Sequence, residues 1–202
     1  TKQEIDFLSQ HKGNITFEIT PQHLTLYAPD CYNKLGTYAQ MNPPIRDKSH
    51  YDKLWYGVKN NLNDTIGSDH APHLKENKEK IYPNSPSGMP GVQTLMPVML
   101  NHVNNEKLSL EQLMNFICEN PVKIFGIKDK GFIKEGFDAD FTIVDMNKKI
   151  TIKNENIESK CGWSPFDGFE FKGIPVSTII AGQIKMRDGK ILGEPTGKPL
   201  VF

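Results

Sequence analysis

Hydrophobic and polar positions follow two different patterns along the chain. Over residues 1–127 most apolar positions recur three or four residues apart, while two shorter runs, 15–20 and 65–69, have the character of strands. This mixture is typical of helices packed around a parallel sheet. From residue 128 onward the pattern changes to short alternating runs with turns such as Asp188-Gly189, which predicts antiparallel strands. We therefore expect two regions, 1–127 and 128–202.

The helices of the first region are marked by the residues that begin them. Thr1 and Ser109 each start a capping-box pattern, Ser49 starts a further helix, and a short helix is expected at 120–126. Apolar faces at helical spacing indicate packing in the core and not a ligand site. The two most regular faces are Tyr51, Leu54, Trp55, Val58 and Leu62, and Val92, Leu95, Met96, Met99, Leu100 and Val103.

A strand–helix–strand unit is predicted from the runs 15–20 and 65–69 and the helix between them. Such a connection implies that the two strands are parallel. Two long loops, 27–46 and 71–91, follow these strands, and loops of that length are usually functional or disordered. The charged segment 75–80 inside the second loop is expected to be solvated and is given no role.

Candidate chemistry gathers at the end of the second strand. The sequence Thr-Ile-Gly-Ser-Asp-His-Ala-Pro-His at 65–73 brings Asp69, His70 and His73 within five positions. The carboxyl ends of strands are where an α/β barrel holds its reactive groups. On spacing alone, a polar turn with surface histidines explains the stretch equally well.

Three motifs that follow one another in a fixed order favour a functional site over a polar turn. Ser-Asp-His-Ala-Pro-His at 68–73, Ser-Pro-Ser-Gly-Met-Pro-Gly at 85–91 and Asn-Pro-Pro-Ile-Arg at 42–46 resemble elements of the dihydroorotases of the amidohydrolase superfamily. The resemblance runs through the whole chain but corresponds only to the C-terminal part of such an enzyme. It implies an α/β fold, with the C-terminal part of a (β/α)8 TIM barrel at 1–127 and strands of a small β-sandwich at 128–202.

The resemblance also implies a role for each site residue. Asp69 would be the catalytic general base and a metal ligand, and His73 would donate a hydrogen bond to the substrate carboxylate. Asn42 and the backbone around Ser87 and Gly88 would bind the polar edge of the pyrimidine ring. The implied reaction is the reversible cyclisation of N-carbamoyl-L-aspartate to dihydroorotate. His70 is expected to orient Asp69 or to pack, without acting as a ligand.

A metal site is implied that this chain cannot complete. The resemblance implies one or two Zn²⁺ per full-length enzyme, and of the ligands only Asp69 has a match here. A catalytic zinc needs about three protein ligands. We therefore expect an incomplete piece, inactive alone, that works with the N-terminal part of the same protein. The opening Thr1, without an initiator Met, is interpreted as an internal position.

Two other functions are carried as alternatives. The first is a related cyclic amidase of the hydantoinase or allantoinase kind, although a ring without a carboxylate has less need of His73. The second is an inactive homologue that serves as an assembly partner for a carbamoyltransferase. The presence of Asp69, His73 and Asn42 argues against it.

Composition excludes several classes of partner. Lys and Arg together number 24, as do Asp and Glu, so no charge excess favours nucleic acid or an anionic membrane. No apolar run approaches the roughly 20 residues of a membrane helix. Three cysteines without a Cys-x-x-Cys motif indicate reduced thiols and a cytoplasmic location. A homodimer is expected from the resemblance.

Overall fold

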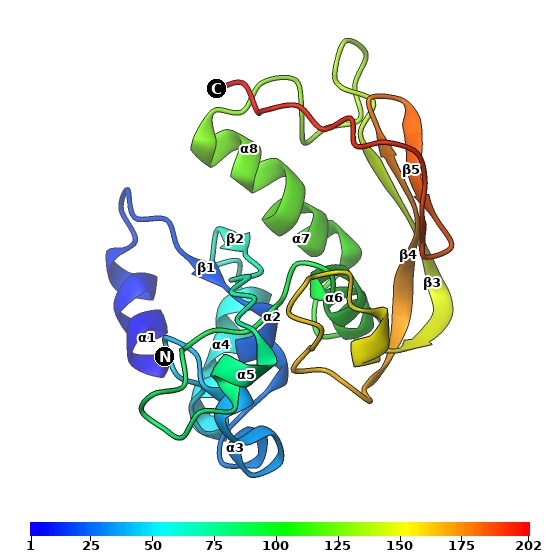
Figure 1. Cartoon of the computed structure of the whole chain (residues 1–202). Helices are drawn as coiled ribbons and strands as arrows, with labels where there is room; N and C mark the ends of the chain where they lie inside the picture. Colours follow the sequence, from blue (N-terminus) through cyan, green and yellow to red (C-terminus); the bar gives the residue numbers. More distant parts are fainter.

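The computed structural model describes residues 1–202 and consists of a helical part beside an antiparallel sheet (Figure 1). The helical part contains a short parallel sheet. Its elements are α1 Lys2–His11, β1 Glu18–Ile19, α2 Pro21–Thr25, α3 Asp30–Leu35, the 3-10 helix Gly36–Ala39, α4 Lys48–Lys59, β2 Thr65–Ile66, α5 Lys75–Lys78, α6 Leu95–Asn104, α7 Leu110–Met114, the π-helical turn Asn115–Glu119 and α8 Asn120–Phe125. The antiparallel part contains β3 Phe141–Thr151, the 3-10 helix Asn154–Asn156, β4 Glu170–Ile180, β5 Gln183–Arg187 and β6 Lys190–Ile191.

The parallel pair forms as the sequence predicts, but its strands are short. β1 pairs with β2 in parallel, with Glu18 opposite Thr65 and Ile19 opposite Ile66, and α4 lies between them in the chain. Each strand has two residues, whereas the pattern predicts strands at 15–20 and 65–69. β1 ends early because Thr20 leaves the strand to cap α2, where its side chain accepts a hydrogen bond from the His23 backbone N–H.

The apolar faces of α4 and α6 form the centre of the core, as expected. Leu54, Trp55 and Val58 of α4 are buried, and the Trp55 indole N–H donates to the Leu24 carbonyl at 3.1 Å. Val98, Met99 and Leu100 of α6 have no exposed surface. Val92, expected on the same face as these, is instead 60% exposed because the chain at 92–94 precedes the helix.

The last two helices of the helical part, α7 and α8, form one continuous helical segment. The capping box of Ser109 and Gln112 opens α7, and Gly126 ends α8 in a left-handed conformation, both as predicted. The segment between them is not a break, because a π-helical turn joins α7 to α8. Pro121 near the start of α8 is tolerated there, since it follows the widened turn.

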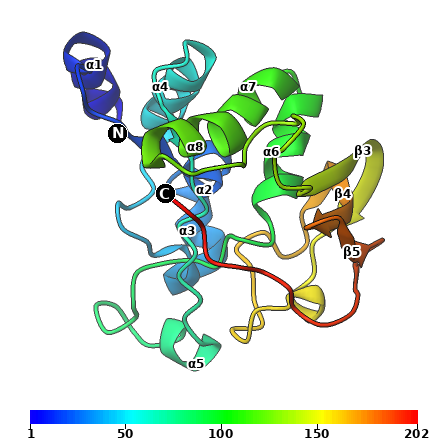
Figure 2. The ribbon, with the colours of Figure 1, turned by 90° about the horizontal axis from the view of Figure 1, so that it is seen from above.

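Four strands in the order β3-β4-β5-β6 form the antiparallel sheet. The Asp188-Gly189 turn joins β5 to β6 as predicted, with both residues at positive φ. One face of β4 packs on α6 (Figure 2), and Gly173 allows the close approach, since a Cβ there would lie 2.9 Å from Leu100. The sheet is therefore anchored on the helical part and not separate from it.

Both long loops contain structure that the sequence pattern does not predict. The segment 27–46 includes α3 and the 3-10 helix, and Cys31 of α3 is buried. The segment 71–91 includes α5, whose last residue is Lys78. The expectation that 75–80 is solvated is wrong for Lys78, because its side chain has no exposed surface. The three cysteines are free, as expected.

Candidate active site at the strand ends

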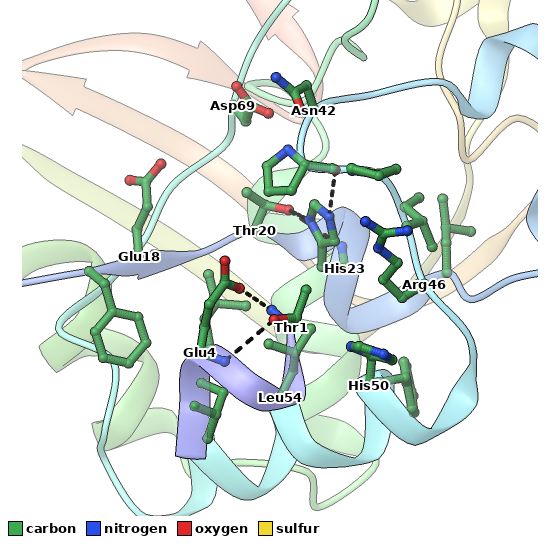
Figure 3. A pocket seen from close by; sticks show the side chains of 18 of the residues that line it. Thr1, Glu4, Glu18, Thr20, His23, Asn42, Arg46, His50, Leu54 and Asp69 are labelled. Carbon is green, nitrogen blue, oxygen red and sulfur yellow. Dashed lines mark hydrogen bonds and ion pairs between the residues drawn. The ribbon is translucent and has the colours of Figure 1, made fainter. Parts of the chain in front are cut away.

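Asp69 lies just beyond the carboxyl end of β2, on the wall of a cavity of about 440 Å³. Its backbone has a positive φ of 43°, which Asp tolerates better than most residues. Asn42, from the long loop after β1, lines the same cavity, and Figure 3 shows both side chains at one end of it. Both residues are exposed, so a ligand can reach their polar atoms.

The cavity is lined by both charged and apolar side chains. Glu4, Glu18 and Arg46 line it together with Asp69 (Figure 3). The apolar lining comes from α1, β1, α4 and the loops beside them, namely Ile5, Leu8, Phe17, Ile19, Leu26, Pro43, Pro44, Ile45 and Leu54. Such a lining suits a small ring with polar groups on one edge.

His23 fixes the loop that carries Asn42. Its Nε2 is 3.0 Å from the carbonyl of Pro43, which can only accept, so Nε2 carries the proton. Its Nδ1 lies 2.8 Å from the Thr20 hydroxyl. Burial lowers the pKa of His23, which favours the neutral ring that this arrangement needs. His23 therefore packs at the strand end, and both of its ring nitrogens are occupied.

His73 is tied to the second loop and not to Asp69. Its Nε2 donates to the Ser87 carbonyl at 3.0 Å, and its own carbonyl accepts from the Trp163 indole N–H at 2.7 Å. Its Nδ1 makes no hydrogen bond within the chain. The ring is thus held by its backbone and by one nitrogen, leaving the other available to a ligand.

Gly88 lets the second loop lie directly against the stretch that carries Asp69 and His73. At its φ of 127°, a Cβ would lie 2.4 Å from the Cβ of Ala71 and 3.4 Å from the His73 ring. The Ala71 N–H donates to the Met89 carbonyl at 2.9 Å, which continues the contact. The three motifs therefore meet at one edge of the structure.

The predicted site residues fall into two groups within this region. Asp69 and Asn42 share the cavity, whereas His73 is bonded to Ser87 and packs on Gly88. His70 is exposed, accepts from the Gly91 backbone N–H at 3.1 Å and makes no hydrogen bond to Asp69.

Several residues that support the site are not marked by any sequence pattern. Gln40 accepts from the Gly88 N–H at 2.9 Å through its carbonyl and donates to the Ser85 carbonyl at 2.9 Å through its side chain. Trp163 reaches back from the second region to His73. Lys78 lies beneath the Ser87 loop. These contacts join segments far apart in sequence, and no motif predicts them.

A cluster of metal-binding side chains is not found in this chain. No three His, Cys, Asp or Glu side chains come together in a way that could bind one. Asp69 offers a single carboxylate, and the nearby His23 has no free ring nitrogen. Zinc binding with Asp69 as the one ligand in this chain thus stays a prediction of the resemblance.

Comparison with known proteins identifies the family. Residues 11–185 match the amidohydrolase family. The chain belongs to this family. The curated dihydroorotase of Pyrococcus furiosus is 40% identical over 187 residues, which are 93% of this chain and 43% of that protein. The dihydroorotase of Methanosphaera stadtmanae is 38% identical over 195 residues, covering 95% of this chain and 44% of that protein. The chain thus spans under half the length of these relatives.

Solved structures of family members confirm the fold class. The L-hydantoinase (dihydropyrimidinase) of Arthrobacter aurescens superimposes with a TM-score of 0.90 at 33% identity, over 96% of this chain and 44% of that one. The inactive dihydroorotase-like domain of a Chaetomium thermophilum CAD-like protein has a TM-score of 0.71 over 96% of this chain and 51% of that one. Its identity of 18% shows likeness of fold alone. This amidohydrolase chain therefore has the expected α/β architecture, a part of the barrel with an antiparallel sheet.

None of its helices is long and apolar enough to cross a membrane.

Proposed function

We propose that this amidohydrolase chain is the C-terminal part of a dihydroorotase of pyrimidine biosynthesis. The observation that carries the proposal is the meeting of three segments at the strand ends. Asp69 and Asn42 line one cavity, and His73 is bonded to the loop of Ser87 and Gly88 that packs against the same stretch. The curated relatives named dihydroorotase support it.

We infer that Asp69 moves the proton of the reaction. In ring opening, the oxygen of water bonds to the amide carbon, the C–N bond breaks, and the water proton passes to the ring nitrogen. An exposed carboxylate at the cavity wall can accept that proton and return it to the nitrogen. Ring closure uses the same transfer in reverse. General acid–base catalysis of this kind contributes about 10²–10⁴ in rate.

The other predicted residues would bind the substrate. The Asn42 side-chain amide can both donate and accept, which matches the N–H and C=O edge of a cyclic imide or amide. With Nε2–H bonded to the Ser87 carbonyl, Nδ1 of His73 would donate to the carboxylate that distinguishes dihydroorotate from simpler rings when the ring is in its imidazolium form, in which both nitrogens are donors. The backbone near Ser87 and Gly88 would bind a further polar group of the substrate.

We propose that the complete protein binds zinc, forms a homodimer and is located in the cytoplasm, as the resemblance to dihydroorotases implies. Asp69 would be one ligand of one or two Zn²⁺, with the other ligands supplied from outside residues 1–202. The chain would work with the N-terminal part of its own protein, as a cytoplasmic homodimer. Within the chain, residues 1–127 would form the barrel portion and residues 128–202 the sandwich strands.

A hydantoinase-type activity is the second candidate, because the hydantoinase structures superimpose so well. The two functions differ in whether the ring carries a carboxylate. Dihydrouracil is dihydroorotate without that group, so the two compounds form a matched pair.

The experiment measures kcat and KM for both rings in the complete enzyme, meaning this chain together with the residues that supply the rest of the site. We expect dihydroorotate to be preferred. His73→Ala should raise the KM for dihydroorotate about tenfold, the loss of one charge-assisted hydrogen bond, and leave dihydrouracil unchanged. Preference for dihydrouracil in the unaltered enzyme would contradict the proposal and favour the hydantoinase alternative.

A further inference from the structure

Lys78 is the only Lys, Arg, Asp or Glu side chain that is buried in the chain. It ends α5 and extends under the Ser87 loop. Its ammonium group donates to the carbonyls of Gln40 at 2.9 Å, Pro86 at 2.8 Å and Gly88 at 3.1 Å. Three acceptors match the three N–H bonds of an ammonium group, and the Trp163 ring lies 5.8 Å from Nζ.

Burying this charge is costly, and no carboxylate offsets the cost. Lys78 forms no salt bridge within the chain, and its partners are neutral carbonyls. A buried charge is unfavourable unless its hydrogen bonds are fully satisfied. Here all three are made, and an apolar side chain of similar length would leave the three carbonyls without this donor. The lysine is therefore tied to the arrangement of this loop.

The lysine determines which way the loop's peptide groups face. The Pro86–Ser87 peptide is trans, so its C=O and N–H point in opposite directions. Because the Pro86 carbonyl is bonded to Lys78, the Ser87 N–H is directed away from it. That N–H makes no hydrogen bond within the chain, and Ser87 is exposed. The Ser87 carbonyl, on the next peptide, is occupied by His73.

We propose that Lys78 is a positioning residue for the substrate carboxylate: its ammonium group holds the Pro86–Ser87 peptide so that the free Ser87 N–H binds a carboxylate oxygen beside His73. This inference rests on the proposed function, since it assigns the anionic group of that substrate. The positive charge behind the carbonyl also aligns with the peptide dipole and strengthens the N–H as a donor to an anion.

The charge state of Lys78 supplies a test that needs no substitution. Burial lowers the pKa of Lys78 to about 8, so the ammonium form predominates at neutral pH and is lost above it. The other titratable groups around it are Glu79 and Tyr38, bonded to each other at 2.8 Å, and His73 across the Gly88 loop. In the complete enzyme, the KM for dihydroorotate should rise above about pH 8, while that for dihydrouracil does not.

Variants separate positioning from simple support of the loop. Lys78→Met keeps the length and apolar stem but removes the charge, and it should raise the KM for dihydroorotate about tenfold and abolish its rise above pH 8. The KM for dihydrouracil should stay within about twofold of the wild type, because that ring has no carboxylate. Lys80→Met is the matched control, since Lys80 is exposed in the same segment and bonds only to Asn77.

Two results would contradict the inference but leave the proposed function standing. One is an equal rise in KM for both rings in Lys78→Met, which indicates a structural role alone. The other is a wild-type KM for dihydroorotate that stays flat up to pH 9.5, which is decisive even where Lys78→Met does not fold. Turnover of dihydrouracil but not of dihydroorotate by the wild type would instead overturn the proposed function, and the inference with it.

Discussion

Gly88 shows how closely the site depends on single residues. Its φ of 127° is one that L-residues avoid, and a Cβ would meet Ala71 at 2.4 Å. Any side chain here would separate the Ser87 loop from the stretch of Asp69 and His73. The glycine is therefore required by both its conformation and its neighbours.

We expect Gly88→Ala to lower the free energy of unfolding by about 2–4 kcal/mol, combining backbone strain with the steric clash. Gly126→Ala is the matched control, because Gly126 has a left-handed backbone, with φ 66° and ψ 28°, but has open space where the Cβ would lie. It should cost only about 1 kcal/mol. Denaturant unfolding of both variants measures this, and equal losses would show that the contact with Ala71 can relax.

The sequence predicts some of the residues at the candidate site and misses others for a physical reason. Five of them lie in local motifs and can be predicted from the sequence alone, namely Asp69, His73, Asn42, Ser87 and Gly88. Lys78 lies in a run of charges that looks solvated, and its burial depends on three carbonyls from two other segments. Contacts of that kind leave no periodic signal.

At the scale of elements, a buried histidine joins three helices. His102 of α6 lies 2.9 Å from the hydroxyl of Thr25 in α2 and packs edge-on against Trp55 of α4. The Thr25 hydroxyl donates to the Pro21 carbonyl, so it accepts from the histidine Nε2–H. The neutral ring therefore fits this junction. Burial, with a smaller effect of Lys107, lowers the pKa of His102 to about 4.

This shift predicts how stability depends on pH. Between pH 6.5 and 4 the unfolded chain binds a proton at His102 that the folded chain does not, so the unfolding free energy falls as pH falls through this range. Above pH 6.5 the contribution is fully present. His102→Gln should weaken this dependence, whereas His11→Gln, at the exposed end of α1, should not. Chemical unfolding at several pH values checks this, and identical slopes for His102→Gln and the unaltered chain would contradict it.

Elements defined by local chemistry are predictable, and elements defined by pairing are less so. The capping boxes at Thr1 and Ser109 start helices as the pattern indicates. The short α3 escapes prediction because six residues carry too little periodicity, and it is held by tertiary contacts such as Tyr32 to the Ile45 carbonyl at 3.0 Å. β1 and β2 are shorter than predicted because only residues that meet a partner strand are paired.

At the scale of the whole molecule, the parallel sheet has only two strands, so both β1 and β2 have an unpaired edge. Ile15, just before β1, is 48% exposed. Free edges of this kind pair readily with other strands. We therefore propose that further barrel strands pair with these two edges.

The resemblance in the sequence predicts this architecture because the motifs follow strands in a fixed order. It could not predict how the second region contacts the site. Trp163 donates to the His73 carbonyl across 90 positions of sequence, and the C-terminal segment returns so that the Lys128 N–H donates to the Val201 carbonyl. Such long-range contacts depend on the packed fold and not on a local pattern.

The most direct test of Asp69 as the catalytic carboxylate of a dihydroorotase uses a chimaera. In it, this chain replaces the matched part of the Pyrococcus furiosus dihydroorotase, and dihydroorotate ring opening is measured. We expect the chimaera to be active, Asp69→Ala to lower its rate by about 10²–10⁴, and the 202-residue chain alone to be inactive. Asp52→Ala, at an exposed position on α4, is the control and should keep full activity. Turnover by the Asp69→Ala chimaera within about threefold of the unaltered one, far short of a general base's contribution, would contradict the assignment.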